Sequence, residues 1–331
     1  MENIHLVMGA NGHLGNNIVR ELLNEGYTVR ASVRDLSNVT PFEGLDCERV
    51  QADLMDKSSL KTAMKGVDVL YLAAAVYRQW AVDVTTEIIN VNIQGTRNAI
   101  EAAVESGVKK VVYISTSLAA DHAKNPIDAD GWNSNTADPY RMSKTEAEKL
   151  AWRLAKQHQI WMVSILPSAL IGPHCYGHMT PSMGFIANVM KNQIPIDPNF
   201  YFNYVDVREI ARYIRIAVEN GKNGERYLLS QESCISSTEV FKLARSLNPE
   251  INIPKKVPYL GMLMVANIMK FKSKITKKQP LMLPHQIKSF YKADKRYDIS
   301  KATKDLGFSP TPQIEVLKDK MKSFMENSVS G

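Results

Sequence analysis

An apolar segment, a turn with regularly spaced glycines and a helical pattern follow one another at the start of this chain, and they constrain the fold most strongly. Residues 4–8 are apolar and lead directly into the sequence Gly-Ala-Asn-Gly-His-Leu-Gly at 9–15. In a strand–turn–helix unit, the first glycine suits a tight turn, the second lets the backbone approach a pyrophosphate, and the third allows close helix–strand packing. The residues that we assign to this dinucleotide-binding turn are Gly9, Asn11, Gly12, His13, Leu14 and Gly15.

Six strand-like segments alternate with helical segments over the first half of the chain. This alternation predicts an α/β fold, a Rossmann-type doubly wound parallel sheet. Residues 225–229 form a seventh strand-like segment that we expect to rejoin the sheet. We expect residues 1–166 to form the cofactor-binding domain, with 204–230 rejoining it, and residues 167–203 and 231–331 to form a smaller, discontinuous C-terminal substrate domain. The six strand-like segments are 4–8, 27–33, 47–51, 67–73, 109–115 and 161–166.

The residues after the second strand-like segment indicate the cofactor. Sites selective for NAD usually place an acid at this strand end, where it binds the adenosine ribose hydroxyls. This chain has Val33 at that point and then Arg34, and a guanidinium suits a 2′-phosphate. Asp35 could compete by pairing with Arg34. The sequence therefore favours NADP(H), with NAD(H) kept as the alternative.

Further cofactor contacts are expected at the carboxyl ends of later strands. Asp53, followed by Leu54, could accept a hydrogen bond from the adenine amine, or it could cap the helix expected at 57–65. Small side chains at the end of the fourth strand would let a nucleotide lie against the backbone. We assign Ala73, Ala74 and Ala75 to the cofactor site on this basis, together with Pro167 and Ala169 after the sixth strand.

A tyrosine and a lysine four positions apart, Tyr140 and Lys144, are the candidate catalytic pair. Asp138-Pro139 is a typical helix start, and residues four apart on a helix lie on one face. An ammonium close to a phenol lowers the pKa of the phenol, which can then exchange a proton with a substrate oxygen. Two hydroxyls, Thr116 and Ser117, end the preceding strand. A second such pair, at positions 291 and 295, has neither a preceding strand of the sheet nor a hydroxyl partner.

Substrate contacts are expected from loops at the same edge of the sheet. Tyr77 and Trp80 follow the fourth strand, and Tyr176 lies in a loop bounded by glycine and proline. That loop also contains His174 and His178, but no acid or further ligand accompanies them, so we expect no metal site.

Charge is distributed unevenly along the chain, whose net charge is +7. Residues 255–304 contain 13 lysines and arginines but only two acids. This basic region could attract an anionic substrate, a membrane surface or nucleic acid, although we expect an ordinary solvated surface and no nucleic-acid partner. The Met-rich apolar segment within 257–278 leaves open a peripheral membrane contact, and a homodimer is also left open. Scattered single cysteines and the lack of a basic leader favour the cytoplasm.

Together these motifs resemble the extended short-chain dehydrogenase/reductases. The chain is most similar to the branch that contains dihydroflavonol reductases and hopanoid-associated sugar epimerase-like proteins. The resemblance covers residues 1–310. It rests on the glycine turn, on residues 29–35, 92–98 and 140–144, and on Gly172-Pro173, 204–207 and 224–227.

The resemblance implies roles for particular residues. Tyr140 resembles the catalytic acid/base, Lys144 the residue that binds the nicotinamide ribose and lowers the pKa of the tyrosine, and Ser117 the hydroxyl that positions the carbonyl. Plant dihydroflavonol reductases often have asparagine five positions beyond that serine, where this chain has His122, which we assign to the substrate site. Sugar-nucleotide dehydratases place two acids after the hydroxyl, and this chain has Leu118-Ala119 instead.

Three functions remain as hypotheses. The first is an NADP(H)-dependent oxidoreductase that reduces a ketone or aldehyde, or oxidises the corresponding alcohol, by hydride transfer. Its small-molecule substrate would be fairly large or apolar. The second is an NAD(P)-dependent epimerase of a sugar or sugar-lipid. The third is a non-catalytic NADP-sensing protein, which is disfavoured because such relatives typically lose the tyrosine.

Overall fold

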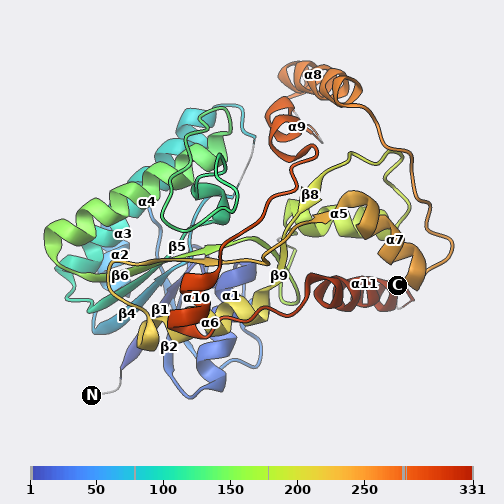
Figure 1. Cartoon of the computed structure of the whole chain (residues 1–331). Coiled ribbons are helices and arrows are strands. Elements are labelled where there is room, and N and C mark those ends of the chain that lie inside the picture. Colours follow the sequence, from blue (N-terminus) through green and yellow to red (C-terminus); the bar gives the residue numbers. More distant parts are fainter. Residues whose placement is uncertain (1–2, 78–79, 178, 278–279, 281, 330–331) are drawn as a thin grey trace.

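A parallel sheet of seven strands forms the centre of the molecule (Figure 1). The computed structural model describes the whole chain except residues 1–2, 78–79, 178, 278–279, 281 and 330–331. The strand order is β10-β6-β5-β4-β1-β2-β3, so the direction of winding reverses between β1 and β4. This order confirms the predicted doubly wound α/β fold, and β10 is the predicted strand that rejoins the sheet beside β6. The strands are β1 (Ile4–Met8), β2 (Thr28–Val33), β3 (Glu48–Gln51), β4 (Val67–Leu72), β5 (Lys110–Ile114), β6 (Trp161–Pro167) and β10 (Arg226–Leu229).

Helices cover both faces of the sheet, which explains the nearly continuous apolar sequence of its strands. Successive side chains of a strand point to opposite faces. In β1, Val7 therefore enters the core beneath α1 and α6, whereas Leu6 and Met8 enter the core beneath α3 and α4. One face is covered by α1 (His13–Asn24), α6 (Val207–Asn220) and α10 (Ser300–Leu306), the other by α2 (Lys57–Ala63), α3 (Asn90–Glu105) and α4 (Pro139–His158). Short helical turns lie at Thr40–Phe42, Thr85–Ile89 and Ser117–Ala119.

A smaller lobe lies beyond the carboxyl ends of the strands (Figure 1). It has its own apolar core, in which Met183, Phe241 and Leu317 are buried. Two small sheets join its parts, because β7 pairs with β9 and β8 pairs with β11. The elements of this lobe are β7 (Ala169–Ile171), α5 (Pro181–Met190), β8 (Tyr201–Phe202), β9 (Tyr204–Asp206), β11 (Ile235–Ser236), α7 (Ser237–Leu247) and α11 (Gln313–Val329).

Two further helices, α8 (Tyr259–Thr276) and α9 (Pro284–Phe290), form the outer end of this lobe (Figure 1). They pack on each other through Met262, Ala266 and Ile287, beside Phe200. The division of the chain into domains stays a prediction. One element departs from it, because α10 packs on α6 and β10 although it falls within 231–331. No helix in the described part of the chain is both long and apolar enough to cross a bilayer.

Candidate active site

A large cavity lies between the carboxyl ends of the strands and the smaller lobe. Its volume is about 1760 Å³. Pockets for one small ligand usually measure 300–1,000 Å³, so this volume suits a long cofactor together with a second ligand. The cavity lies where the strand order reverses, which is where open α/β sheets bind nucleotides. It begins at the glycine turn and ends beneath α8 and α9.

The glycine turn closes tightly at one end of the cavity. Gly9 has a φ of +78°, and a Cβ atom there would lie 2.9 Å from the Ala74 Cα. A Cβ atom on Gly15 would lie 2.1 Å from the Gly9 carbonyl oxygen, so the close approach of α1 to the turn requires glycine. No side chain caps α1, whose N-cap is Gly12. The turn therefore offers backbone N–H groups and a helix N-terminus to an anion, and these features fit a dinucleotide pyrophosphate.

The strand ends beside the turn complete this half of the cavity. All the residues that we assigned to the cofactor from the sequence line the cavity: Gly9, Asn11, Gly12, His13, Leu14, Gly15, Arg34, Asp53, Leu54, Ala73, Ala74, Ala75, Tyr140, Lys144, Pro167 and Ala169.

Arg34 is exposed at the end of β2 and is available to a ligand. Asp35 does not compete for it, because the Asp35 carboxylate accepts hydrogen bonds from the Ser37 backbone N–H at 2.9 Å and the Ser37 hydroxyl at 2.7 Å. Within the described part of the chain, Arg34 forms no ion pair. Asp56, rather than Asp53, caps α2. The Asp53 carboxylate lies at the cavity wall and accepts one hydrogen bond, from the Met55 backbone N–H at 2.8 Å.

Tyr140 lies at the start of α4, which Asp138 anchors. The Asp138 carboxylate accepts hydrogen bonds from the backbone N–H groups of Tyr140 at 3.0 Å and Arg141 at 3.2 Å, and Pro139 occupies the first turn. Burial raises the pKa of the Tyr140 phenol well above its ordinary value of 10.0, and the neighbouring Tyr77 and Asp138 add to this effect. The phenol is therefore protonated at neutral pH and can act as an acid.

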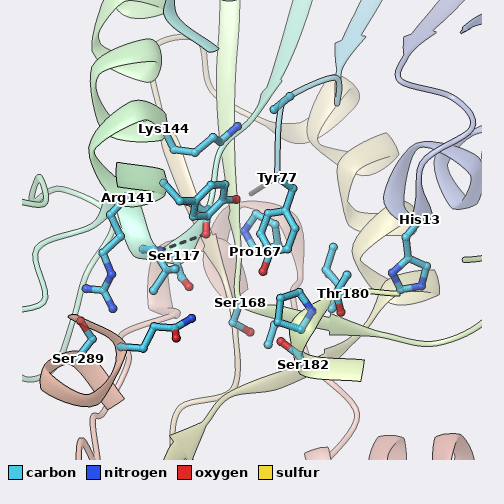
Figure 2. A pocket seen from close by; sticks show the side chains of 18 of the residues that line it. His13, Tyr77, Ser117, Arg141, Lys144, Pro167, Ser168, Thr180, Ser182 and Ser289 are labelled. Atoms are coloured by element: carbon cyan, nitrogen blue, oxygen red, sulfur yellow. Dashed lines mark hydrogen bonds between the residues drawn. The ribbon is translucent and has the colours of Figure 1, made fainter. Parts of the chain in front are cut away.

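Lys144 is buried one turn further along α4 and points toward the sheet (Figure 2). Its ammonium donates a hydrogen bond of 2.8 Å to the Ile114 carbonyl and lies 5.3 Å from the centre of the Tyr113 ring. Burial lowers the pKa of Lys144 to about 8. In the protein alone, burial outweighs every opposing effect on Tyr140, so its pKa lies above the ordinary value. The lowering of that pKa by Lys144 stays a prediction.

Thr116, to which the sequence analysis gave no catalytic role, lines the cavity beside Tyr140. A hydrogen bond between the Thr116 side chain and the Tyr140 phenol lowers the pKa of the phenol and partly offsets burial. Ser117 also lines the cavity, and its carbonyl accepts a hydrogen bond of 3.0 Å from the His122 Nε2. Both hydroxyls directly follow β5. The sequence therefore indicated where the hydroxyl would lie, but not which of the two adjacent residues would supply it.

Tyr77 and His122 lie on the cavity wall near Tyr140. The Tyr77 ring meets the Tyr140 ring edge-on, with 4.8 Å between their centres. Because the His122 Nε2 donates to a carbonyl, this ring carries its proton on Nε2. Burial, aided by the positive charge of Arg141, lowers the pKa of His122 to about 4, so the ring is neutral at physiological pH. Figure 2 shows Tyr77, Ser117 and Lys144 around one region of the cavity.

Two of the expected substrate residues do not line the cavity. The Tyr176 hydroxyl accepts a hydrogen bond of 2.6 Å from the Arg20 guanidinium and packs beside His174, which holds the ring outside the cavity wall. Trp80 is half-buried and is not among the described residues of the cavity wall.

The second tyrosine–lysine pair, at positions 291 and 295, lacks the geometry of Tyr140 and Lys144. Tyr291 directly follows α9, so it and Lys295 do not share a helix. His178 lies outside the described residues. Among the residues that are described, no group of three or more His, Cys, Asp or Glu side chains could hold a metal ion.

The end of the cavity away from the glycine turn is largely apolar. Its wall includes Phe185, Phe202, Met262, Met269 and Met282.

Arg141 and Ser289 face each other at this apolar end (Figure 2). Arg141 is only 3% exposed, and its one ion pair, to Asp138, is long at 3.5 Å. The Arg141 Nε and the Ser289 Oγ are buried and make no hydrogen bond with described residues. Buried polar groups normally find a partner, so this pair suits an oxygen of a bound molecule.

The chain matches the profile of the NAD dependent epimerase/dehydratase family over residues 5–230. It is 28% identical to sterol demethylase protein B of Methylococcus capsulatus over 98% of this chain and 99% of that protein. It is 33% identical to a putative dihydroflavonol 4-reductase of Synechocystis over 70% of this chain and 69% of that protein.

Solved structures show the same fold. The crystal structure of gox2253 has a TM-score of 0.84 with 27% identity and covers 98% of this chain and 99% of that chain. The yeast methylglyoxal/isovaleraldehyde reductase Gre2, complexed with NADPH, has a TM-score of 0.76 with 20% identity, over 98% of this chain and 99% of that chain.

Proposed function

Because the chain belongs to the NAD-dependent epimerase/dehydratase family, we propose that it is an NADP(H)-dependent reductase that converts a ketone or aldehyde to an alcohol. The observation that supports this proposal best is a protonated, buried Tyr140 between the nucleotide-binding half of the cavity and its apolar half. An acid at this position can protonate a carbonyl oxygen held above the strand ends. Relatives with reductase names support the same reaction type.

Each residue around Tyr140 has its own role in the proposed reaction. The nicotinamide supplies the hydride that adds to the carbonyl carbon. Tyr140 donates its phenolic proton to the carbonyl oxygen. The Thr116 hydroxyl holds the phenol in place and also donates a hydrogen bond to the carbonyl oxygen. Lys144 holds the ribose side of the cofactor and offers its proton to restore Tyr140. Tyr77, whose ring meets that of Tyr140 edge-on, covers one side of the phenol.

Arg34 carries the preference for NADP(H). Its exposed guanidinium would bind the 2′-phosphate by charge-assisted hydrogen bonds, which contribute about 1.5–3 kcal/mol. Arg34→Ala should therefore weaken NADPH binding by about tenfold to a hundredfold and leave NADH binding nearly unchanged. Arg49→Ala is the matched control, because Arg49 is exposed on the next strand but is not on the cavity wall.

The substrate should combine a large apolar part with an oxygen remote from the reacting carbonyl. The methionine and phenylalanine side chains beneath α8 and α9 fit the apolar part. Arg141 and Ser289 fit the oxygen, because their buried polar atoms have no hydrogen-bond partner among the described residues. A polar sugar nucleotide would bury its hydroxyls against this apolar wall at a cost in free energy.

The test combines binding and turnover. Tyr140→Phe should retain NADPH affinity and reduce the turnover of a panel of apolar ketones and aldehydes by about 10²–10⁴-fold. Retained turnover in this variant would remove Tyr140 from the mechanism. The family name keeps an epimerase as the second candidate. Such an enzyme keeps its cofactor through a cycle without net oxidation, so protein purified with tightly bound cofactor, and without net consumption of NADPH, would favour the epimerase.

A further inference from the structure

Helix α8 is apolar on two opposite faces. Residues on the inner face, Met262, Ala266 and Ser273, are buried against the rest of the lobe. Met262, Val265 and Met269 also form part of the cavity wall. Other apolar side chains of the helix do not lie on this inner face.

The outer face carries a continuous apolar stripe that no described residue covers. Its five side chains are between 61% and 77% exposed. They are spaced by four, four, three and four positions, which places them on one side of an α-helix. Single exposed apolar residues are common on soluble proteins, but a row of five on one helix is unusual. The stripe consists of Leu260, Met264, Ile268, Phe271 and Ile275.

Lysines flank this stripe on both sides. Lys270 and Lys274 lie along one edge and Lys272 along the other, as helical spacing requires, and Lys277 follows at the end of the helix. All four are exposed. The sequence contains no acidic residue between Lys255 and Ala293, and no described acid pairs with these lysines. The stripe is therefore bordered by uncompensated positive charge.

We propose that the outer face of α8 docks the protein on the surface of an anionic lipid bilayer. An apolar stripe that lies between lysines is the pattern of helices that rest in the plane of a membrane interface, where the apolar side chains enter the acyl boundary and the lysines meet lipid phosphates. Lipid fits this face better than a second copy of the chain, because a symmetric contact would bring two lysine-bordered faces together and they would repel each other.

The opposite face of α8 strengthens this proposal. Because that face lines the cavity, docking would place the apolar wall of the cavity beneath the lipid surface. A helix that serves the cavity on one side and the bilayer on the other needs apolar residues on two opposite faces, as α8 has. Docking itself does not depend on the proposed reaction.

Vesicle flotation tests the proposal with the full-length protein. The wild type should float with vesicles of phosphatidylcholine and phosphatidylglycerol, and floating should decrease in high salt or with phosphatidylcholine alone. The double variant Ile268→Glu/Phe271→Glu should lose binding by more than about tenfold. The variant Lys270→Glu/Lys274→Glu should lose the preference for anionic vesicles by about tenfold or more. Val39→Glu is the matched control, because Val39 is exposed on the sheet domain.

Thermal unfolding and NADPH binding should be the same in all variants, which separates loss of docking from misfolding. The proposal fails if the wild type does not float with anionic vesicles. It also fails if Ile268→Glu/Phe271→Glu floats as well as the wild type. A wild-type dimer that this variant breaks into monomers, without vesicle binding by either protein, would assign the stripe to a second copy of the chain.

Discussion

Replacing Lys144 with methionine should stabilise the protein near neutral pH while it removes the activity. Burial lowers the pKa of Lys144 from 10.5 to about 8, so the folded protein holds this charge at a cost. At about 1.36 kcal/mol for each pKa unit, the cost is about 3 kcal/mol at pH 7. Methionine removes the charge and keeps a similar length, but it loses the hydrogen bond to the Ile114 carbonyl, worth about 1 kcal/mol. The expected net gain is about 2 kcal/mol.

The stability difference between the wild type and Lys144→Met should change with pH in a definite direction. The folded state binds fewer protons than the unfolded state between about pH 8 and 10.5, so the wild type gains stability as the pH rises through this window. The advantage of Lys144→Met should therefore shrink by about 2 kcal/mol between pH 7 and about pH 9.5. Urea unfolding of both proteins at the two pH values measures this difference.

Lys149→Met provides the control on the same helix. Lys149 forms a partly exposed ion pair with Glu146, and its replacement should change the free energy of unfolding by less than about 1 kcal/mol at either pH. If Lys144→Met destabilises the protein at pH 7, or if its advantage does not shrink as the pH rises, then Lys144 is not the costly buried cation described above.

Three further substitutions test other parts of the site. Thr116→Val should lower kcat by about tenfold to a hundredfold at unchanged NADPH affinity, whereas Ser117→Ala should change it far less; the reverse order would restore the sequence-based choice of serine. Gly15→Ala should weaken NADPH binding more than about tenfold, measured by titration alongside thermal unfolding, because the added Cβ atom would collide with the Gly9 carbonyl. Normal NADPH affinity of Gly15→Ala would show that the turn can shift to accommodate the added Cβ atom. Arg141→Met should raise KM more than it lowers kcat, and an unchanged KM would exclude Arg141 from substrate binding.

The sheet and the nucleotide half of the site could be predicted because their sequence patterns are local. The glycine turn directly follows a buried strand, and its spacing has a geometric reason at Gly9 and Gly15. Parallel strands end at the same edge of a sheet, so residues after successive strands had to meet there. Even β10, which lies far along the chain, was visible as a short apolar strand.

The substrate half could not be predicted in the same way, because its residues come from loops without periodicity. Tyr176 was a reasonable candidate by position, but Arg20 on α1 holds its hydroxyl instead. Thr116 and Ser117 are neighbours that both line the cavity, so their position after β5 does not by itself decide which hydroxyl serves Tyr140. The facing pair of Arg141 and Ser289 joins helices far apart in sequence. No local pattern could have indicated that contact.

Net oxidation of NADPH in the presence of carbonyl compounds tests the central claim most directly. The purified protein, freed of small molecules, is mixed with NADPH and a panel of ketones and aldehydes with large apolar groups, and the loss of nicotinamide absorbance is followed. We expect stoichiometric conversion of NADPH and of at least one carbonyl compound to NADP and an alcohol, and almost none with Tyr140→Phe. Tightly bound cofactor that copurifies with the protein, together with no net oxidation of NADPH by any member of the panel, would contradict the reductase proposal.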